Sequence, residues 1–199
     1  MQNNNGTTPG STADAKKAIR REKISARKSL TAEYRRAADQ AVCRNLAEIA
    51  GDFQGNVLVG YVTDGTEPDV NAVMQTHLDH GGILCVPRFE SATDYRIVTV
   101  KDLHFTSSIW GIPEPDASAP ETDAALLKKA LWLIPGVAFD ESLMRLGRGK
   151  GVYDRLLQHG FARTVGVFYE CQKCEKIPSE CHDCSLDMIV TENGIYKIN

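Results

Sequence analysis

The residues best suited to chemistry lie between positions 145 and 155, where the sequence is RLGRGKGVYDR. This segment, the glycine loop, combines three glycines at alternate positions with four cationic side chains. Because glycine has no side chain to block a close approach, Gly147, Gly149 and Gly151 allow successive backbone N–H groups to converge on one anion. The pattern therefore favours polyphosphate binding, and a flexible surface turn with solvated cations is the alternative.

The charged side chains of the glycine loop fit the same interpretation. Arg145 and Arg148 can bind phosphate oxygens as forks, and Lys150 can bind them as a point charge. Asp154 is a candidate Mg²⁺ ligand, since Mg²⁺ commonly takes one or two carboxylates together with phosphate oxygens. Pairing of Asp154 with Arg155 or another cation is the alternative. The segment is neither a Walker motif, because no Ser or Thr follows Lys150, nor a GxGxxG motif.

The composition is that of an ordinary globular protein. With 199 residues, 42% hydrophobic and 25% charged, the chain predicts a single domain over 14–199 after a disordered polar tail over 1–13. A net charge of −3 argues against general nucleic-acid binding. No apolar run approaches the roughly 18 residues that span a bilayer, and the amino end lacks the apolar core of a signal peptide. A cytosolic location without membrane contact is therefore expected.

The elements that must position the glycine loop follow from changes in hydrophobic period. Helical spacing predicts helices over 14–29, 31–50, 69–82, 122–130 and from 152 onward. Short apolar runs predict strands over 56–64, 82–89, 95–100, 131–139 and 163–170. Thr31 is the expected N-cap of the second helix, and a closing hairpin is expected around Asn193 and Gly194.

This alternation predicts an α/β fold of three layers, with a mostly parallel, Rossmann-like sheet between helices on both faces. The architecture would be similar to that of sugar-phosphate isomerases and CoA-transferases. In such sheets, ligands bind beyond the carboxyl ends of the strands. The glycine loop follows the expected strand 131–139 and precedes a helix, so the sequence places it at that edge.

Residues 135–157, PGVAFDESLMRLGRGKGVYDRLL, resemble the signature of the 5-formyltetrahydrofolate cyclo-ligases, also called 5,10-methenyltetrahydrofolate synthetases. Other segments resemble the family in the same order, so that the resemblance covers about 16–192: KKAIRREKISARKSL, GYVTDGTEPDV, CVPRF, WGIPEP and IPSECHDCSLDMIVTE. One departure is Val152, which stands where the family often has a first tyrosine before Tyr153.

The resemblance implies an enzyme that uses ATP and Mg²⁺ to convert 5-formyltetrahydrofolate to 5,10-methenyltetrahydrofolate. In this family the formyl oxygen is thought to attack the γ-phosphate, after which N10 attacks the formyl carbon and phosphate leaves. Phosphorylation is needed because an amide oxygen is a poor leaving group, and positioning with charge neutralisation supplies most of the catalysis. The expected partners are a reduced folate and ATP, and the expected oligomeric state is a monomer or weak dimer.

The resemblance also implies roles for individual residues. The ATP-binding set would be Lys16, Arg20, Arg145, Gly147, Arg148, Gly149, Lys150, Gly151 and Tyr153. Within it, Lys150, Arg148 and Tyr153 would be catalytic. Glu67, Trp110 and Arg148 would bind the folate, and Asp154 and Asp187 would bind Mg²⁺. From the residues alone, a solvated basic face for Lys16 and Arg20, and a packed loop anchor for Trp110, are the alternatives.

The cysteines near the carboxyl end pose a separate question. Cys171, Cys174, Cys181 and Cys184 form two CxxC pairs, with His182 beside them. Four thiolates can hold a structural Zn²⁺, which would brace the loop that carries Asp187. The family needs no zinc, so reduced thiols are the alternative.

Three other functions are weighed against the cyclo-ligase. A sugar-phosphate isomerase or CoA-transferase would need a carboxylate base or nucleophile, for which Glu67 is the candidate. A non-catalytic nucleotide- or RNA-binding protein on the same scaffold lacks support from any stripe of cations interleaved with aromatic residues. A zinc-dependent interaction protein would rest on the cysteines alone. The cyclo-ligase is the function that the sequence predicts.

Overall fold

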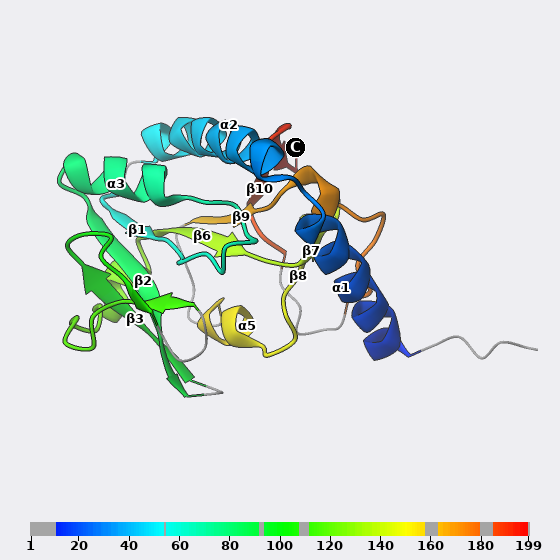
Figure 1. The fold of residues 1–199 in the computed structure, drawn as a ribbon. Helices are drawn as coiled ribbons and strands as arrows, with labels where there is room; N and C mark the ends of the chain where they lie inside the picture. The colour runs from blue at the N-terminus through cyan, green and yellow to red at the C-terminus, as the bar shows by residue number, and fades with distance from the viewer. Residues whose placement is uncertain are drawn as a thin grey trace, which may run out of the picture.

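The centre of the fold is a seven-stranded sheet with the order β11-β10-β9-β6-β1-β2-β3, shown in Figure 1. The computed structural model describes residues 11–53, 55–91, 94–107, 112–157, 163–179 and 185–198. Five neighbouring strands are parallel: β10 (Met188–Thr191), β9 (Arg163–Val167), β6 (Leu131–Pro135), β1 (Val57–Val59) and β2 (Ile83–Ser91). The edge strands β3 (Asp94–Val100) and β11 (Gly194–Lys197) are antiparallel to their neighbours. The predicted α/β fold is confirmed.

Helices cover both faces of this sheet. Figure 1 shows α2 (Ala32–Asp52) and α3 (Asn71–Asp79) on one face, and α5 (Val152–Leu156) on the other. The first face buries the apolar stripe of α2 against Leu58 and Leu133. The second face buries Trp132 and Ile134 beneath α5 and the short α4 (Ala124–Leu127). Because β6 is covered on both faces, all five of its residues are buried, which explains its uninterrupted apolar sequence.

Local caps define the helix ends. The Thr31 hydroxyl accepts a hydrogen bond from the Tyr34 N–H at 3.2 Å, so the predicted N-cap of α2 is confirmed. Helix α1 (Thr12–Lys28) begins inside the predicted tail, because Ser11 caps it by accepting from the Asp14 N–H. Residues 12 and 13 are therefore helical, whereas the prediction placed them in the tail. No helix in the described ranges is long and apolar enough to cross a membrane.

The predicted strand over 131–139 is interrupted, and this changes how the glycine loop is presented. After β6, the chain leaves the sheet at Gly136 and forms β7 (Ala138–Phe139), which pairs with β8 (Arg145–Leu146). A side chain at Gly136 would lie 2.7 Å from the Phe168 ring, so the backbone passes there only because the residue is glycine. The glycine loop therefore extends from β8 rather than directly from a strand of the main sheet. A second small sheet pairs β4 (Thr106–Ser107) with β5 (Pro113–Glu114), and η2 (Glu170–Gln172) follows β9.

Candidate active site

A cavity of about 240 Å³ lies beyond the carboxyl ends of β1 and β6, and we call it the strand-end cavity. Its position is the one at which open α/β sheets bind ligands. Four parts of the chain line it: the loop after β1, the end of β6, the glycine loop with α5, and residues from β2, β3 and β5. The candidate site residues among its walls are Glu67, Arg145, Gly147, Arg148, Lys150, Gly151, Tyr153 and Asp154.

The glycine loop has a backbone that only glycine adopts readily. Gly149 and Gly151 have φ values of +91° and +63°, in the left-handed region that other L-residues avoid. At Gly147, a side chain would approach the Arg145 guanidinium at 2.8 Å. The turn and the close approach at this strand end therefore explain the alternate glycines that the sequence singles out.

Arg145 fixes the base of the glycine loop. Its side chain is buried, donates to the Pro135 carbonyl at 3.2 Å and to the Asp154 carboxylate at 2.8 Å, and lies 5.4 Å from the centre of the Tyr153 ring. These contacts make Arg145 a support for the loop and for α5, and its binding of ATP phosphates stays a prediction. Burial first, and the charge of Glu67 second, raise the pKa of Tyr153, so its phenol stays neutral.

Helix α1 brings a second arginine to the same loop. The Arg20 Nε donates to the Gly147 carbonyl at 2.8 Å, and its guanidinium lies 3.4 Å from the position that a side chain on Gly149 would take. Lys16, one helical turn earlier, is buried at 7% exposure. The alternative of a solvated basic face is therefore wrong for these two residues.

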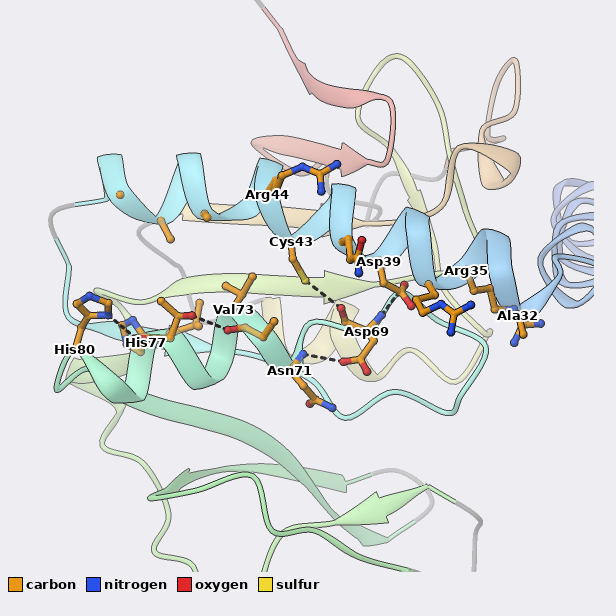
Figure 2. Close-up of a pocket in the computed structure, with 18 residues that line it drawn as sticks. Ala32, Arg35, Asp39, Cys43, Arg44, Asp69, Asn71, Val73, His77 and His80 are labelled. Atoms are coloured by element: carbon orange, nitrogen blue, oxygen red, sulfur yellow. Dashed lines mark hydrogen bonds between the residues drawn. The ribbon is translucent and has the colours of Figure 1, made fainter.

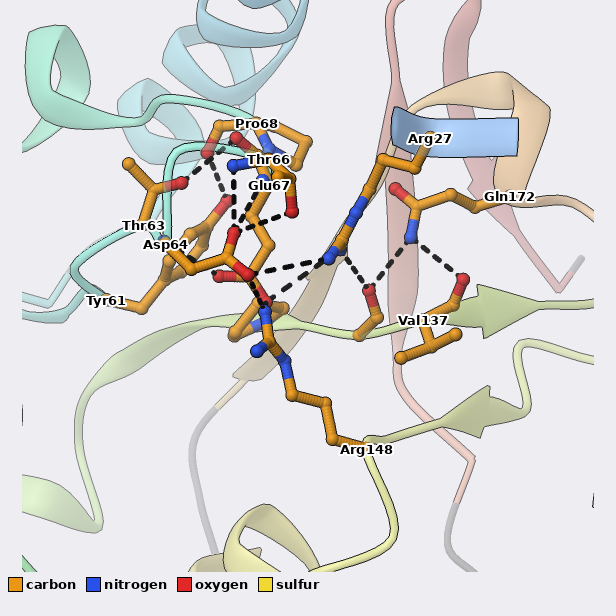
Figure 3. Close-up of polar contacts among 12 residues, drawn as sticks. Arg27, Tyr61, Thr63, Asp64, Thr66, Glu67, Pro68, Val137, Arg148 and Gln172 are labelled. Carbon is orange, nitrogen blue, oxygen red and sulfur yellow. Dashed lines mark hydrogen bonds and ion pairs between the residues drawn. The ribbon is translucent and has the colours of Figure 1, made fainter. Parts of the chain in front are cut away.

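Arg148 extends from the loop to two carboxylates on the opposite wall. Its Nη2 donates to Asp64 and, at 3.0 Å, to Glu67 (Figure 3). Behind the carboxylates lies Arg27, which is 2% exposed, stands 3.8 Å from both of them and donates to the Gly136 carbonyl at 3.2 Å. Sequence reasoning missed Asp64 and Arg27. Both lie in segments that resemble the family, but no local pattern marks them.

The two carboxylates have opposite pKa shifts. Burial raises the pKa of Asp64, but hydrogen bonds from Arg148 and Thr66 outweigh it and lower the value to about 2. Burial dominates at Glu67 and raises its pKa, although the charge of Arg148 offsets part of the effect. Asp64 is thus firmly ionised, whereas Glu67 is the carboxyl of the pair that takes up a proton more readily.

Asp187 lies away from the strand-end cavity. Its carboxylate accepts from the Thr164 N–H at 2.7 Å and the Thr164 hydroxyl at 2.8 Å, near the amino ends of β9 and β10. Thr164 pairs with Trp132, three residues before Pro135, which corresponds to about 10 Å along the sheet. Asp154 lines the strand-end cavity and Asp187 is not among its lining residues, and the binding of Mg²⁺ by these two aspartates stays a prediction.

Three predicted residues lie outside the described part of the chain: Trp110, Cys181 and Cys184. Cys171 and Cys174 are free thiols, and burial raises the pKa of both. No group of three or more possible metal ligands occurs within the described ranges. The zinc site over all four cysteines therefore stays a prediction.

Comparisons with known proteins agree with this geometry. Residues 12–192 match the model of the 5-formyltetrahydrofolate cyclo-ligase family. The chain belongs to this family. A 5-formyltetrahydrofolate cyclo-ligase of Mycolicibacterium smegmatis is 31% identical over 83% of this chain and 92% of the relative. One of Haemophilus influenzae is 28% identical over 86% and 95%.

Solved structures named as synthetases of the same family share the fold. The 5,10-methenyltetrahydrofolate synthetase of Aquifex aeolicus superposes with a TM-score of 0.77 at 28% identity, covering 92% of both chains. That of Mycoplasma pneumoniae gives a TM-score of 0.72 at 21% identity, covering 89% of this chain and 98% of the other, which supports the fold alone. The cyclo-ligase fold thus extends over nearly the whole chain.

Proposed function

We propose that the protein catalyses the ATP-dependent cyclisation of 5-formyltetrahydrofolate to 5,10-methenyltetrahydrofolate, with release of ADP and phosphate. The observation that carries this proposal is the meeting, in one cavity, of the glycine loop, the Arg148 guanidinium and the buried carboxylate of Glu67. Membership of the cyclo-ligase family supports the reaction. The alternative, a non-catalytic nucleotide-binding protein, leaves Glu67 and the rest of the cavity without a role.

The glycine loop is the part that would bind the ATP phosphates. Gly147, Gly149 and Gly151 expose backbone N–H groups, and Lys150 supplies an exposed ammonium on the cavity wall. Arg20 holds the Gly147 carbonyl, so it keeps this segment in shape from behind. The loop backbone and the Lys150 ammonium would together neutralise charge at the transferred phosphoryl group, as positioning-dependent phosphoryl transfer requires.

Mg²⁺ fits this arrangement through Asp154. The Asp154 side chain lines the cavity, is 47% exposed, and has one oxygen held by Arg145, which orients the carboxylate beside the loop. A single carboxylate is enough, because Mg²⁺ usually completes its shell with phosphate oxygens and water. When bound, the ion supplies further neutralisation of phosphate charge.

The other wall of the cavity would bind the folate. Glu67 is buried and can accept hydrogen bonds from ring N–H groups, while Tyr61 and Tyr95 give aromatic surface. The formyl oxygen would take the γ-phosphoryl group as the bond to ADP breaks. N10 would then attack the formyl carbon and lose its proton, and the carbon–oxygen bond would break to release phosphate, which balances that proton as hydrogen phosphate. The protein's task is to hold the formyl oxygen in line with the phosphate on the glycine loop.

The test is the near-ultraviolet absorbance of purified protein mixed with 5-formyltetrahydrofolate, with and without MgATP. A methenyl-folate band that grows only with MgATP is the expected result. If no band forms while calorimetry still detects MgATP binding, the protein is a nucleotide binder on the cyclo-ligase scaffold and the proposed reaction is wrong.

A further inference from the structure

Two guanidiniums and two carboxylates form a compact charged cluster at the wall of the strand-end cavity (Figure 3). We call it the ion quartet, and its members are Arg27, Asp64, Glu67 and Arg148. The formal charges cancel. Arg27 is buried and fixed by the Gly136 carbonyl, whereas the Arg148 side chain is 45% exposed. The quartet therefore has one fixed cation and one that solvent reaches.

The two oxygens of Asp64 have separate tasks. Oδ1 accepts from the Thr66 N–H and the Thr66 hydroxyl, both at 2.8 Å, and from the Glu67 N–H at 3.1 Å. These bonds shape the loop that follows β1. Oδ2 makes no such bond and instead faces Arg148, with Arg27 3.8 Å away. The hydrogen bonds that shape the loop use only Oδ1. They do not explain why the second oxygen, Oδ2, faces the two arginines.

Arg148 is well placed to exchange partners. It lies between Gly147 and Gly149, its side chain is 45% exposed, and it lines the same cavity as Lys150. A phosphate bound to the loop would offer it a bidentate partner of higher charge than either carboxylate. If Arg148 turned away, Arg27 would remain beside Asp64 and Glu67 as their counter-charge.

We propose that Asp64 is a positioning residue for nucleotide binding, which holds the Arg148 guanidinium on the loop after β1 and competes with the ATP phosphates for it. Asp64 thereby keeps Arg148 pointed into the cavity before ATP arrives, at the cost of some affinity for ATP. This inference rests on the proposed function, since it takes ATP to be the anion that displaces the carboxylate.

The experiment is isothermal titration calorimetry of MgATP, without folate, on the full chain and on Asp64→Asn. The substitution suits the question because the asparagine oxygen can keep all three loop bonds, while its amide no longer attracts Arg148. We expect Asp64→Asn to bind MgATP roughly three- to fivefold more tightly, the effect expected for a partly exposed ion pair. A variant that merely damages the loop would bind more weakly instead.

Two further variants make the result specific. Asp69→Asn is the matched control, because Asp69 lies in the same connection between β1 and α3, is also partly exposed, and uses one oxygen to accept from the Asn71 N–H. Its MgATP affinity should equal that of the wild type. In an Arg148→Met background, the gain from Asp64→Asn should disappear, since the effect acts through Arg148.

The outcomes separate the two proposals. Unchanged or weaker MgATP binding by Asp64→Asn, or a gain of the same size in the Arg148→Met background, overturns the competition between Asp64 and phosphate. A wild-type protein that binds no MgATP overturns the proposed function itself.

Discussion

The groove between α2 and α3 has a volume of about 1000 Å³, whereas the strand-end cavity has about 240 Å³. Figure 2 shows the larger hollow, the α2–α3 groove, lined mostly by residues of α2 and α3. Its titratable groups mostly bond to nearby structure: Asp39 accepts from the Tyr169 hydroxyl, Cys43 donates to the Asp69 carbonyl, and His80 contacts its own helix.

The smaller hollow differs in how its walls are built. It collects loops from several strand ends, and its charged groups converge, since Arg148 of the glycine loop meets Asp64 and Glu67 of the loop after β1. Helix faces present side chains that are already spaced by the helix, while loops at parallel strand ends can direct unlike groups at one point. The comparison teaches that convergence of charge, and not volume, marks the site.

The sharpest way to break this comparison is to remove one cation from each hollow. Lys150→Ala should lower kcat/KM about 10³-fold, because it removes the ammonium that would neutralise negative charge on the transferred phosphoryl group. Arg44→Ala removes a cation that lines the α2–α3 groove and should change kcat/KM less than twofold. Initial rates of methenyl-folate formation measure both. Comparable losses in the two variants would mean that the groove takes part in the reaction.

The next largest effect concerns stability. Arg27→Met should lower the free energy of unfolding by about 3 kcal/mol, since it leaves Asp64 and Glu67 with only the partly exposed Arg148 as counter-charge. Arg36→Met, an exposed position of the α2–α3 groove, should change it by less than about 0.5 kcal/mol. Urea unfolding monitored by circular dichroism gives both values. Equal losses in the free energy of unfolding would show that the buried Arg27 guanidinium stabilises the fold no more than an exposed arginine does.

Replacing one glycine by alanine in each region compares how the stability of the protein depends on the local backbone conformation. Gly149→Ala should cost about 1–2 kcal/mol of stability, because alanine is strained at φ +91°. Gly51→Ala, near the end of α2, meets no atom within 4 Å and should stabilise the protein by up to about 1 kcal/mol. Thermal unfolding distinguishes the signs. A neutral Gly149→Ala variant would mean that the loop adopts another backbone.

These glycines also illustrate what sequence can predict. The glycine loop, the Thr31 cap and the hairpin at Gly194 depend on residues close together in the chain, and local patterns specify them. The strand order of the sheet could be expected only in outline, as an alternation of strands and helices. The break after β6 could not be foreseen, because it depends on Phe168 packing where a side chain on Gly136 would lie.

Two members of the ion quartet, Arg27 and Asp64, were beyond sequence reasoning for a related reason. Arg27 lies in a helix full of cations, and nothing local separates it from Lys28, yet one is 2% exposed and the other faces solvent. Asp64 lies in a turn, where an aspartate needs no further explanation. Asp187 is a further case, since alignment with a family motif does not reveal that Thr164 donates two hydrogen bonds to its carboxylate. Long-range contacts decide all three.

The smallest effects should appear in the pH dependence of stability, where the two regions have opposite signs. The pKa of Asp64 is lowered to about 2 from an ordinary 3.8, so its stabilising contribution is complete above about pH 4 and is lost as pH falls toward 2. Asp64→Asn should therefore be less stable than wild type by about 1–2 kcal/mol at pH 6, and the gap should close in acid.

Burial raises the pKa of Asp39 in the α2–α3 groove, which makes its charge a cost at neutral pH. Asp39→Asn, whose oxygen can still accept from Tyr169, should gain a smaller amount at pH 6, and this gain should also vanish in acid. Urea unfolding at pH 3, 4, 5 and 6 tests both signs, and two variants that shift in the same direction would contradict the contrast between a charge-paired carboxylate and a buried one.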